Sequence, residues 1–95
     1  MRVVSNKRLR DFAARHPDAE TPLQAWRRLI QTMHAANFAM VKKFMNATDK
    51  VGDFHVFDIG GNKFRIVAGV DYARQVVYVK HVFTHGEYEK WSKGR

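Results

Sequence analysis

The first half of the chain repeats its apolar residues at intervals of three and four, the spacing of helices that bury one face. Ser5 stands where a helix cap is expected, and His16 precedes a proline, which disfavours helical backbone. The pattern therefore predicts a first helix over 6–15, preceded by a short strand over 2–5. The apolar stripe of this helix consists of Leu9, Phe12 and Ala13.

A second helix is predicted over residues 21–35, because that segment begins with a threonine followed by a proline. Thr21 can cap the first turn, and Pro22 suits the first helical position. The same apolar spacing predicts a shorter helix over 38–46, whereas residues 48–52 have the composition of a loop. The first half is thus predicted to be helical.

The second half alternates apolar and polar residues, which predicts strands. Residues 60–62, a Gly-Gly-Asn turn, join the first two strands, since glycine and asparagine adopt positive φ at little cost. Thr84 and Glu87 form a capping box that opens a last helix, which ends near Gly94. The predicted strands are 54–59, 64–72 and 77–83.

Helices followed by an antiparallel meander predict an α+β fold. In this fold the N-terminal helices pack on one face of a small antiparallel sheet, and a short C-terminal helix follows it. Residues 1–95 are expected to form a single domain.

Strand alternation also assigns side chains to the two faces of the sheet. Lys63 and Arg65 fall on the face away from the helices. The assignment of the last strand depends on its register, and we predict that Ala68 pairs with His81. The core face then receives Val77, Val79, His81 and Phe83, and the open face receives Tyr78, Lys80 and Val82.

The composition narrows the class of partner. The net charge is +8 and the sequence pI is near 10.2, which favours a polyanion or an acidic protein as partner. The chain has no cysteine and no apolar run of the length that spans a bilayer, so we expect a cytoplasmic protein without membrane contact.

The cations and two further side chains form a set suited to cleaving RNA without a metal ion. RNA supplies the 2′-hydroxyl as nucleophile, so a protein needs to move protons and stabilise charge on the phosphate. Lys63 and Arg65 are the predicted phosphate contacts, and His85 with Tyr88 would share one face of the last helix as proton carrier and base-stacking partner. Further RNA contacts are predicted at Lys80 and Arg74.

Other catalytic chemistries find little support in the sequence. His81 and His85 are separated by a break between strand and helix, so they do not form a helical zinc pair. The acidic residues are scattered, which argues against a magnesium-dependent nuclease, and no phosphate-binding or dinucleotide-binding glycine motif is present. We therefore expect neither a metal nor a cofactor.

The segments 56–68 and 82–88 together resemble the HigB toxins of bacterial type II toxin–antitoxin systems. The resemblance extends over nearly the whole chain and implies a RelE-like toxin fold. It also implies a ribosome-dependent endoribonuclease that cuts translated mRNA and requires no metal. The implied partner is a HigA antitoxin with a helix-turn-helix domain, through which the complex would bind operator DNA.

By this resemblance, Lys63 and Arg65 match the basic residues that the family carries on its sheet. His85 and Tyr88 match the family's residues near the C-terminal helix. Asp58 departs from it, because the family often has asparagine there. That carboxylate would either hold an arginine or weaken phosphate binding. Two other functions remain open, a poison of DNA gyrase on the same fold, as in ParE proteins, and a basic RNA-binding module without toxicity.

Overall fold

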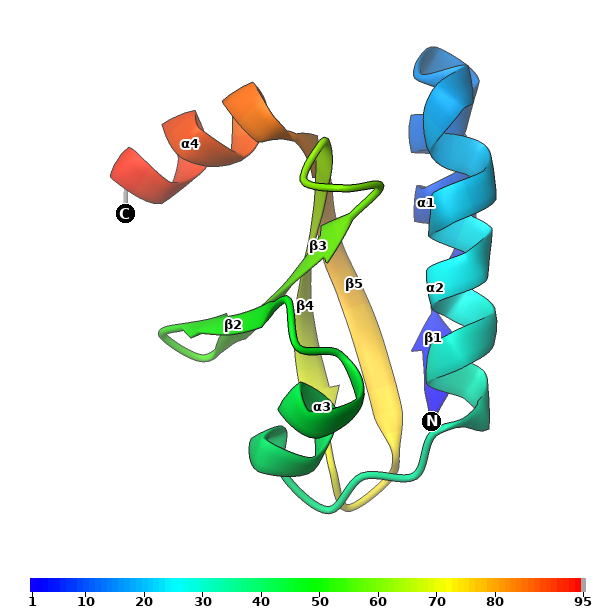
Figure 1. Ribbon diagram of the computed structural model, residues 1–95, viewed down its shortest axis with the longest axis vertical. Coiled ribbons are helices and arrows are strands. Elements are labelled where there is room, and N and C mark those ends of the chain that lie inside the picture. The colour runs from blue at the N-terminus through cyan, green and yellow to red at the C-terminus, as the bar shows by residue number, and fades with distance from the viewer. Residues whose placement is uncertain (95) are drawn as a thin grey trace.

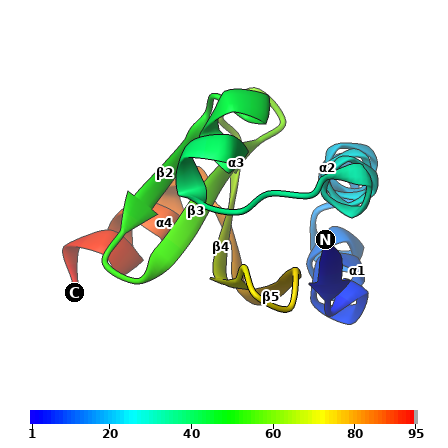
Figure 2. The ribbon, with the colours of Figure 1, turned by 90° about the horizontal axis from the view of Figure 1, so that it is seen from below.

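A computed structural model describes residues 1–94 and has a five-stranded sheet with helices on both sides (Figure 1). The strand order is β1-β5-β4-β3-β2. Helices α1 and α2 lie side by side on one side of the sheet, and α4 projects on the other (Figures 1 and 2). The elements in chain order are β1 (Arg2–Val4), α1 (Asn6–Arg15), a 3-10 turn (Pro17–Ala19), α2 (Glu20–Thr32), α3 (Phe38–Phe44), β2 (Thr48–Val51), β3 (Phe54–Ile59), β4 (Phe64–Asp71), β5 (Val76–Thr84) and α4 (His85–Lys93).

The α+β class is confirmed, whereas the prediction of a purely antiparallel sheet is wrong. Strands β2 to β5 form an antiparallel meander, but β1 pairs with β5 in parallel. Residues 48–52, predicted as a loop, contain strand β2, which pairs with β3. The sheet is therefore mixed and larger than predicted.

Helix α1 has the predicted bounds, and α3 is two residues shorter than predicted. The predicted start of α2 is wrong, because the helix begins at Glu20 after the 3-10 turn. Thr21 and Pro22 consequently lie inside its first turn, and its cap position, Ala19, offers no side-chain hydrogen bond. None of the helices in residues 1–94 is both long and apolar enough to cross a membrane.

The main core lies between the helices and one face of the sheet. Its largest fully buried side chains include Phe12, Leu23, Ile30 and Phe57. Rings of the helices and the sheet meet edge to face, for example Trp26 and Phe57, whose centroids are 5.1 Å apart. This packing holds the sheet in place, and the opposite face of the sheet remains available for α4 and the site residues.

A β-bulge in β5 overturns the predicted faces of its second half. His81 pairs with Val67 while Val79 pairs with Ala68, so Lys80 is an extra residue between them. The predicted pairing of Ala68 with His81 is therefore wrong. Val82 packs against the main core. The rings of His81 and Phe83 stack on each other and lie near the tilted ring of Trp91 in α4, outside that core.

His55 is a buried polar residue of the core face, with 3% of its surface exposed. Its Nε2 shares a hydrogen bond of 2.5 Å with the Tyr72 hydroxyl, and its Nδ1 has no hydrogen-bond partner among residues 1–94. Burial, assisted by the charge of Lys50, lowers the pKa of His55 below its ordinary value of 6.5. The folded protein thus favours the neutral imidazole.

We expect the fold to lose stability as the pH falls below about 6.5, because His55 then takes a proton more readily in the unfolded chain. The stability that the neutral ring supports is complete above that pH and declines toward the lower folded-state pKa. Urea unfolding at about pH 7.5 and pH 5.5 measures this loss. In His55→Gln the loss should be smaller than in wild type, whereas the exposed control His34→Gln should leave it unchanged.

Candidate functional site

The hairpin between β3 and β4 brings its cations to the start of α4. Gly60, Gly61 and Asn62 all adopt positive φ, between 62° and 82°, as the predicted turn requires. Beyond the turn, Phe64 pairs with Thr84 across β4 and β5. The backbone N–H of His85 donates to the carbonyl of Lys63 over 2.9 Å, so the hairpin and the helix start are in direct contact.

The predicted capping box sets the direction of α4. The Thr84 hydroxyl accepts from the Glu87 N–H, and the Glu87 carboxylate accepts from the Thr84 N–H. Residues 85 and 88 then lie on one side of the helix. His85 Nδ1 is 3.1 Å from Nη2 of Arg65, and the Tyr88 ring lies 5.6 Å from the Arg65 guanidinium carbon. The predicted convergence of hairpin and helix is confirmed at Arg65.

The guanidinium of Arg65 has all five of its N–H donors occupied within the protein. Nε donates to Asp58 at 2.9 Å, and Nη1 donates to the carbonyls of Asn62 and Phe64 at 3.0 and 3.2 Å. Nη2 donates to the Asn62 side chain at 2.9 Å and to His85 Nδ1. The Arg65 side chain is 8% exposed. The sequence predicted that the guanidinium would be open to a phosphate, but in this structure its N–H groups are already bound to other residues.

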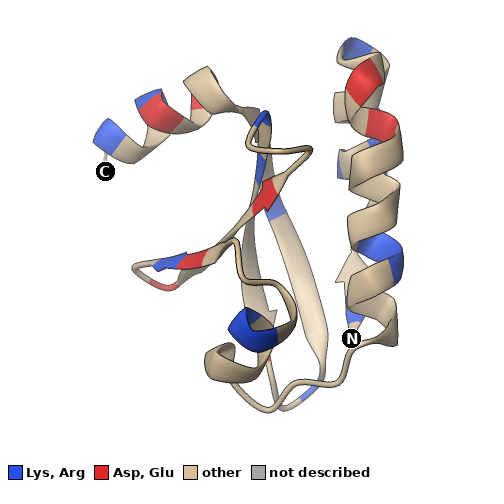
Figure 3. Ribbon diagram, viewed as in Figure 1, with Lys and Arg blue, Asp and Glu red and all other residues tan. Residues whose placement is uncertain are grey.

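Asp58 is the residue whose role the sequence left open. It faces Arg65 in the register of β3 and β4, and its carboxylate is three-quarters buried. Figure 3 shows acidic and basic positions close together where β3 and β4 run side by side. Of the two roles considered, Asp58 fulfils the first, holding the arginine in place.

Arg65 also determines which nitrogen of His85 accepts a hydrogen bond in this contact. A guanidinium only donates hydrogen bonds, so Nδ1 of His85 carries a lone pair and Nε2 carries the hydrogen. Nε2 lies 3.0 Å from a carboxylate oxygen of Glu89, one helical turn further along. The imidazole thus lies between a cation and an anion, with half of its side-chain surface exposed.

The three other predicted phosphate or RNA contacts are dispersed over the sheet. Lys63 is exposed at the hairpin, next to His85 through its backbone. Lys80 is exposed at the bulge of β5, where its ammonium lies 5.5 Å from the Tyr78 ring. Arg74 follows the far end of β4, roughly 20 Å of strand from the hairpin. It pairs with Asp71 at 3.5 Å, so the structure does not bring Arg74 to the site.

Comparison with known proteins identifies the family. A family model for HigB toxins, described as the RelE-like toxic component of a toxin–antitoxin system, matches residues 19–91. The chain belongs to the HigB toxin family. It is 34% identical to the mRNA interferase toxin HigB of Escherichia coli K12 over 92 residues, which cover 94% of this chain and 88% of the relative. The mRNA interferase HigB of Escherichia coli O6:H1 is 24% identical over 98% of this chain and 93% of its own length.

Two residues of this candidate site were missed by the sequence reasoning. Glu89 stands four positions after His85 on a predicted helix, so helical spacing alone could have indicated the pair. Asn62 was interpreted only as a turn residue, and no local signal indicates that its side chain accepts from Arg65. Residues 1–94 contain no group of three histidine or carboxylate side chains arranged for a metal.

Trp91 anchors α4, the helix that carries His85 and Tyr88 of the candidate site. Its ring lies 5.7 Å from that of Phe54 in β3 and 5.9 Å from that of Phe83 in β5. It also lies 5.9 Å from the ring of Tyr88. This aromatic cluster holds α4 against the sheet face opposite α1 and α2, and it thereby holds His85 and Tyr88 beside the hairpin.

Proposed function

We propose that this HigB-family chain is a ribosome-dependent mRNA interferase that cuts translated mRNA by attack of the 2′-hydroxyl, without a metal ion. The similar proteins named above are mRNA interferases. The observation that carries the proposal is the contact between Arg65 Nη2 and His85 Nδ1, which joins a phosphate-binding group to a proton acceptor. The catalytic residues are Lys63, Arg65, His85 and Tyr88, with Lys80 as a further RNA contact.

Entry of a phosphate starts the reaction by competing for Arg65. A phosphate oxygen is a stronger acceptor than an imidazole nitrogen, so it takes the Nη2 hydrogen that His85 Nδ1 accepts in the free protein. The remaining bonds to Asp58 and Asn62 keep the guanidinium in position. Nδ1 of His85 is then free at the place where the phosphate binds.

The freed nitrogen takes the proton of the 2′-hydroxyl as its oxygen attacks phosphorus. Glu89 stabilises the resulting imidazolium through Nε2, as a carboxylate does for a catalytic histidine. The attack forms a 2′,3′-cyclic phosphate and breaks the bond to the 5′-oxygen. That oxygen takes a proton from the ammonium of Lys63, which is exposed beside the site. Tyr88 stacks on the base of the cut nucleotide.

The partner of a HigB-family toxin is an antitoxin. We propose a HigA-type protein with a helix-turn-helix domain, through which the complex binds operator DNA. Its acidic side chains would cover the cationic hairpin by charge complementarity. The place of action is the cytoplasm, where the ribosomes translate.

Reconstituted translation with a defined mRNA tests the proposal. Primer extension should detect cuts only when ribosomes translate the message, and a single 2′-deoxy nucleotide on the 5′ side of the cut should abolish that cut. The antitoxin encoded beside the toxin should stop cleavage. Intact mRNA together with gyrase-dependent DNA breaks would instead establish a gyrase poison, and cleavage of the 2′-deoxy message would refute the 2′-hydroxyl mechanism.

A further inference from the structure

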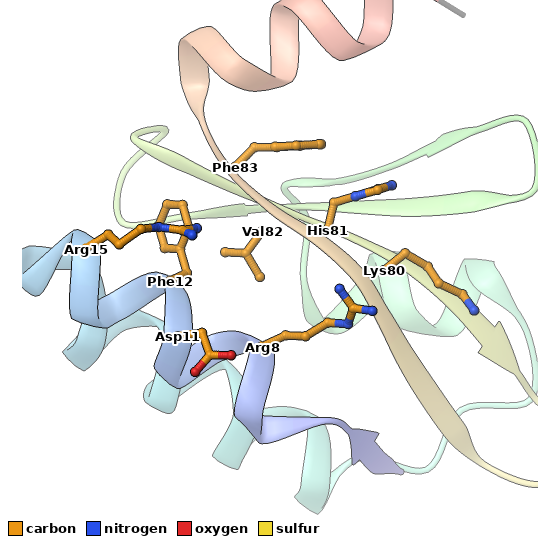
Figure 4. A pocket seen from close by; sticks show the side chains of 8 residues that line it. All are labelled: Arg8, Asp11, Phe12, Arg15, Lys80, His81, Val82 and Phe83. Carbon is orange, nitrogen blue, oxygen red and sulfur yellow. The ribbon is translucent and has the colours of Figure 1, made fainter.

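A groove between α1 and β5 lies next to the site and was not predicted from the sequence. It has a volume of about 260 Å³ and is lined by residues of only these two elements (Figure 4). Phe12 and Val82 contribute apolar surface, and the charged lining comes from Arg8 and Arg15 of α1 and Lys80 of β5. The three cations surround a segment of β5 whose outer edge pairs with no other strand of the described sheet.

This unpaired edge exists because β1 is short. It pairs with β5 only from Val76 to Tyr78, after which the chain turns into α1. In the described part of the chain, residues 79–84 of β5 have β4 on one side and no strand on the other. The groove follows this edge and ends at Phe83, which faces Arg65 in the register of β4 and β5.

The cations of the groove have little anionic compensation. Arg15 lies over the Phe12 ring, and Lys80 lies over the Tyr78 ring. The one acidic residue of the lining, Asp11, is paired with Lys7 at 2.7 Å, and Figure 4 shows its carboxylate turned away from β5. Arg8 reaches toward β5 (Figure 4). Burial, assisted by the charge of Arg8, lowers the pKa of His81.

Aromatic rings border the groove at β5, on the side of the strand that faces away from α1 (Figure 4). The rings of His81 and Phe83 are stacked, with centroids 5.0 Å apart and planes inclined by 13°. Cations that follow a backbone, combined with flat rings on which bases stack, are the features by which proteins bind single-stranded nucleic acid. An acidic peptide would use the cations but not the rings, so RNA fits the lining better.

We propose that this groove binds the single-stranded mRNA that flanks the cut nucleotide, through phosphate contacts of Arg8, Arg15 and Lys80. The inference rests on the proposed function for the identity of the ligand. It adds to that function a track leading from α1 along β5 to Arg65, so that the message is held on one side of the cut.

The test measures RNA binding apart from cleavage. Fluorescence anisotropy with a labelled, fully 2′-O-methylated oligonucleotide reports affinity at several salt concentrations, because this RNA has no free 2′-hydroxyl. The variant Arg8→Gln/Arg15→Gln should bind several-fold more weakly. Its plot of log affinity against log salt should be less steep by about 1.4, since each phosphate contact to a single strand contributes about 0.7.

The matched control is Arg10→Gln/Arg28→Gln, which removes the same charge from exposed positions that do not line this groove. It should keep the wild-type slope, and circular dichroism should show both variants folded. Equal slopes for the two variants would refute RNA binding in the groove, even if ribosomal cleavage proceeds as proposed. A groove variant that loses binding of polyglutamate but retains RNA would assign the groove to an acidic peptide instead.

Discussion

Replacing His85 with alanine is expected to lower the rate of mRNA cleavage by about 10²- to 10⁴-fold, the range for a positioned proton-transfer group. The substitution removes the acceptor that Arg65 holds in place and leaves the phosphate contacts intact. Because half of the His85 side chain is exposed, the variant should fold and still bind the antitoxin. Single-turnover cleavage on programmed ribosomes measures the rate, and relief of growth arrest measures its consequence in cells.

Two further substitutions distinguish the contribution of the His85 ring from that of its neighbour Glu89 and from that of an unrelated histidine. Glu89→Gln keeps a hydrogen-bond acceptor beside Nε2 but removes the charge that stabilises an imidazolium, so its loss should be smaller than that of His85→Ala. His34→Ala, at an exposed position between α2 and α3, should cleave as wild type does. Full toxicity of His85→Ala at equal protein level would remove this residue from the mechanism.

Local sequence motifs correctly predicted the turn between β3 and β4 and the start of α4, because short-range interactions determine both. Asparagine and two glycines specify the turn, and the Thr84–Glu87 capping box starts α4 within one residue of its predicted place. Together these two features bring His85 to the hairpin. Both motifs can be recognised in the sequence, because the residues that form each one are neighbours along the chain.

The bulge in β5 illustrates what alternation cannot predict. One extra residue at Lys80 reverses the faces of everything that follows, yet the pattern of apolar residues is compatible with both registers. Val82 therefore reaches the main core, and His81 and Phe83 join the aromatic cluster under α4. That change also created the stacked rings of the groove.

Two further features depend on partners distant in sequence. Strand β2, Thr48–Val51, carries exposed charged residues and forms through its pairing with β3. Strand alternation assigned Arg65 to the open face of the sheet, where charged residues are mostly exposed. Its burial requires acceptors from β3, from the turn and from α4 at once, and only the assembled fold brings them together.

Replacing Arg65 with methionine is expected to lower the free energy of unfolding by about 3 kcal/mol and to abolish cleavage. Loss of one partner of a buried ion pair costs about 3–5 kcal/mol, and the lower value applies because Asp58 keeps a quarter of its side chain exposed. Urea unfolding measures the change. Arg74→Met, which breaks the exposed pair with Asp71, should cost less than about 1 kcal/mol and leave cleavage unchanged.

The double variant Arg65→Met/Asp58→Leu separates stability from catalysis. Removing both charges leaves no unpaired carboxylate, so much of the lost stability should return. Cleavage should not return, because no group remains to bind the phosphate beside His85 Nδ1. If the stabilised double variant cut mRNA at the wild-type rate, Arg65 would be only a support of the hairpin. In the proposed reaction, Asp58 and Asn62 hold the guanidinium while its Nη2 exchanges His85 for a phosphate.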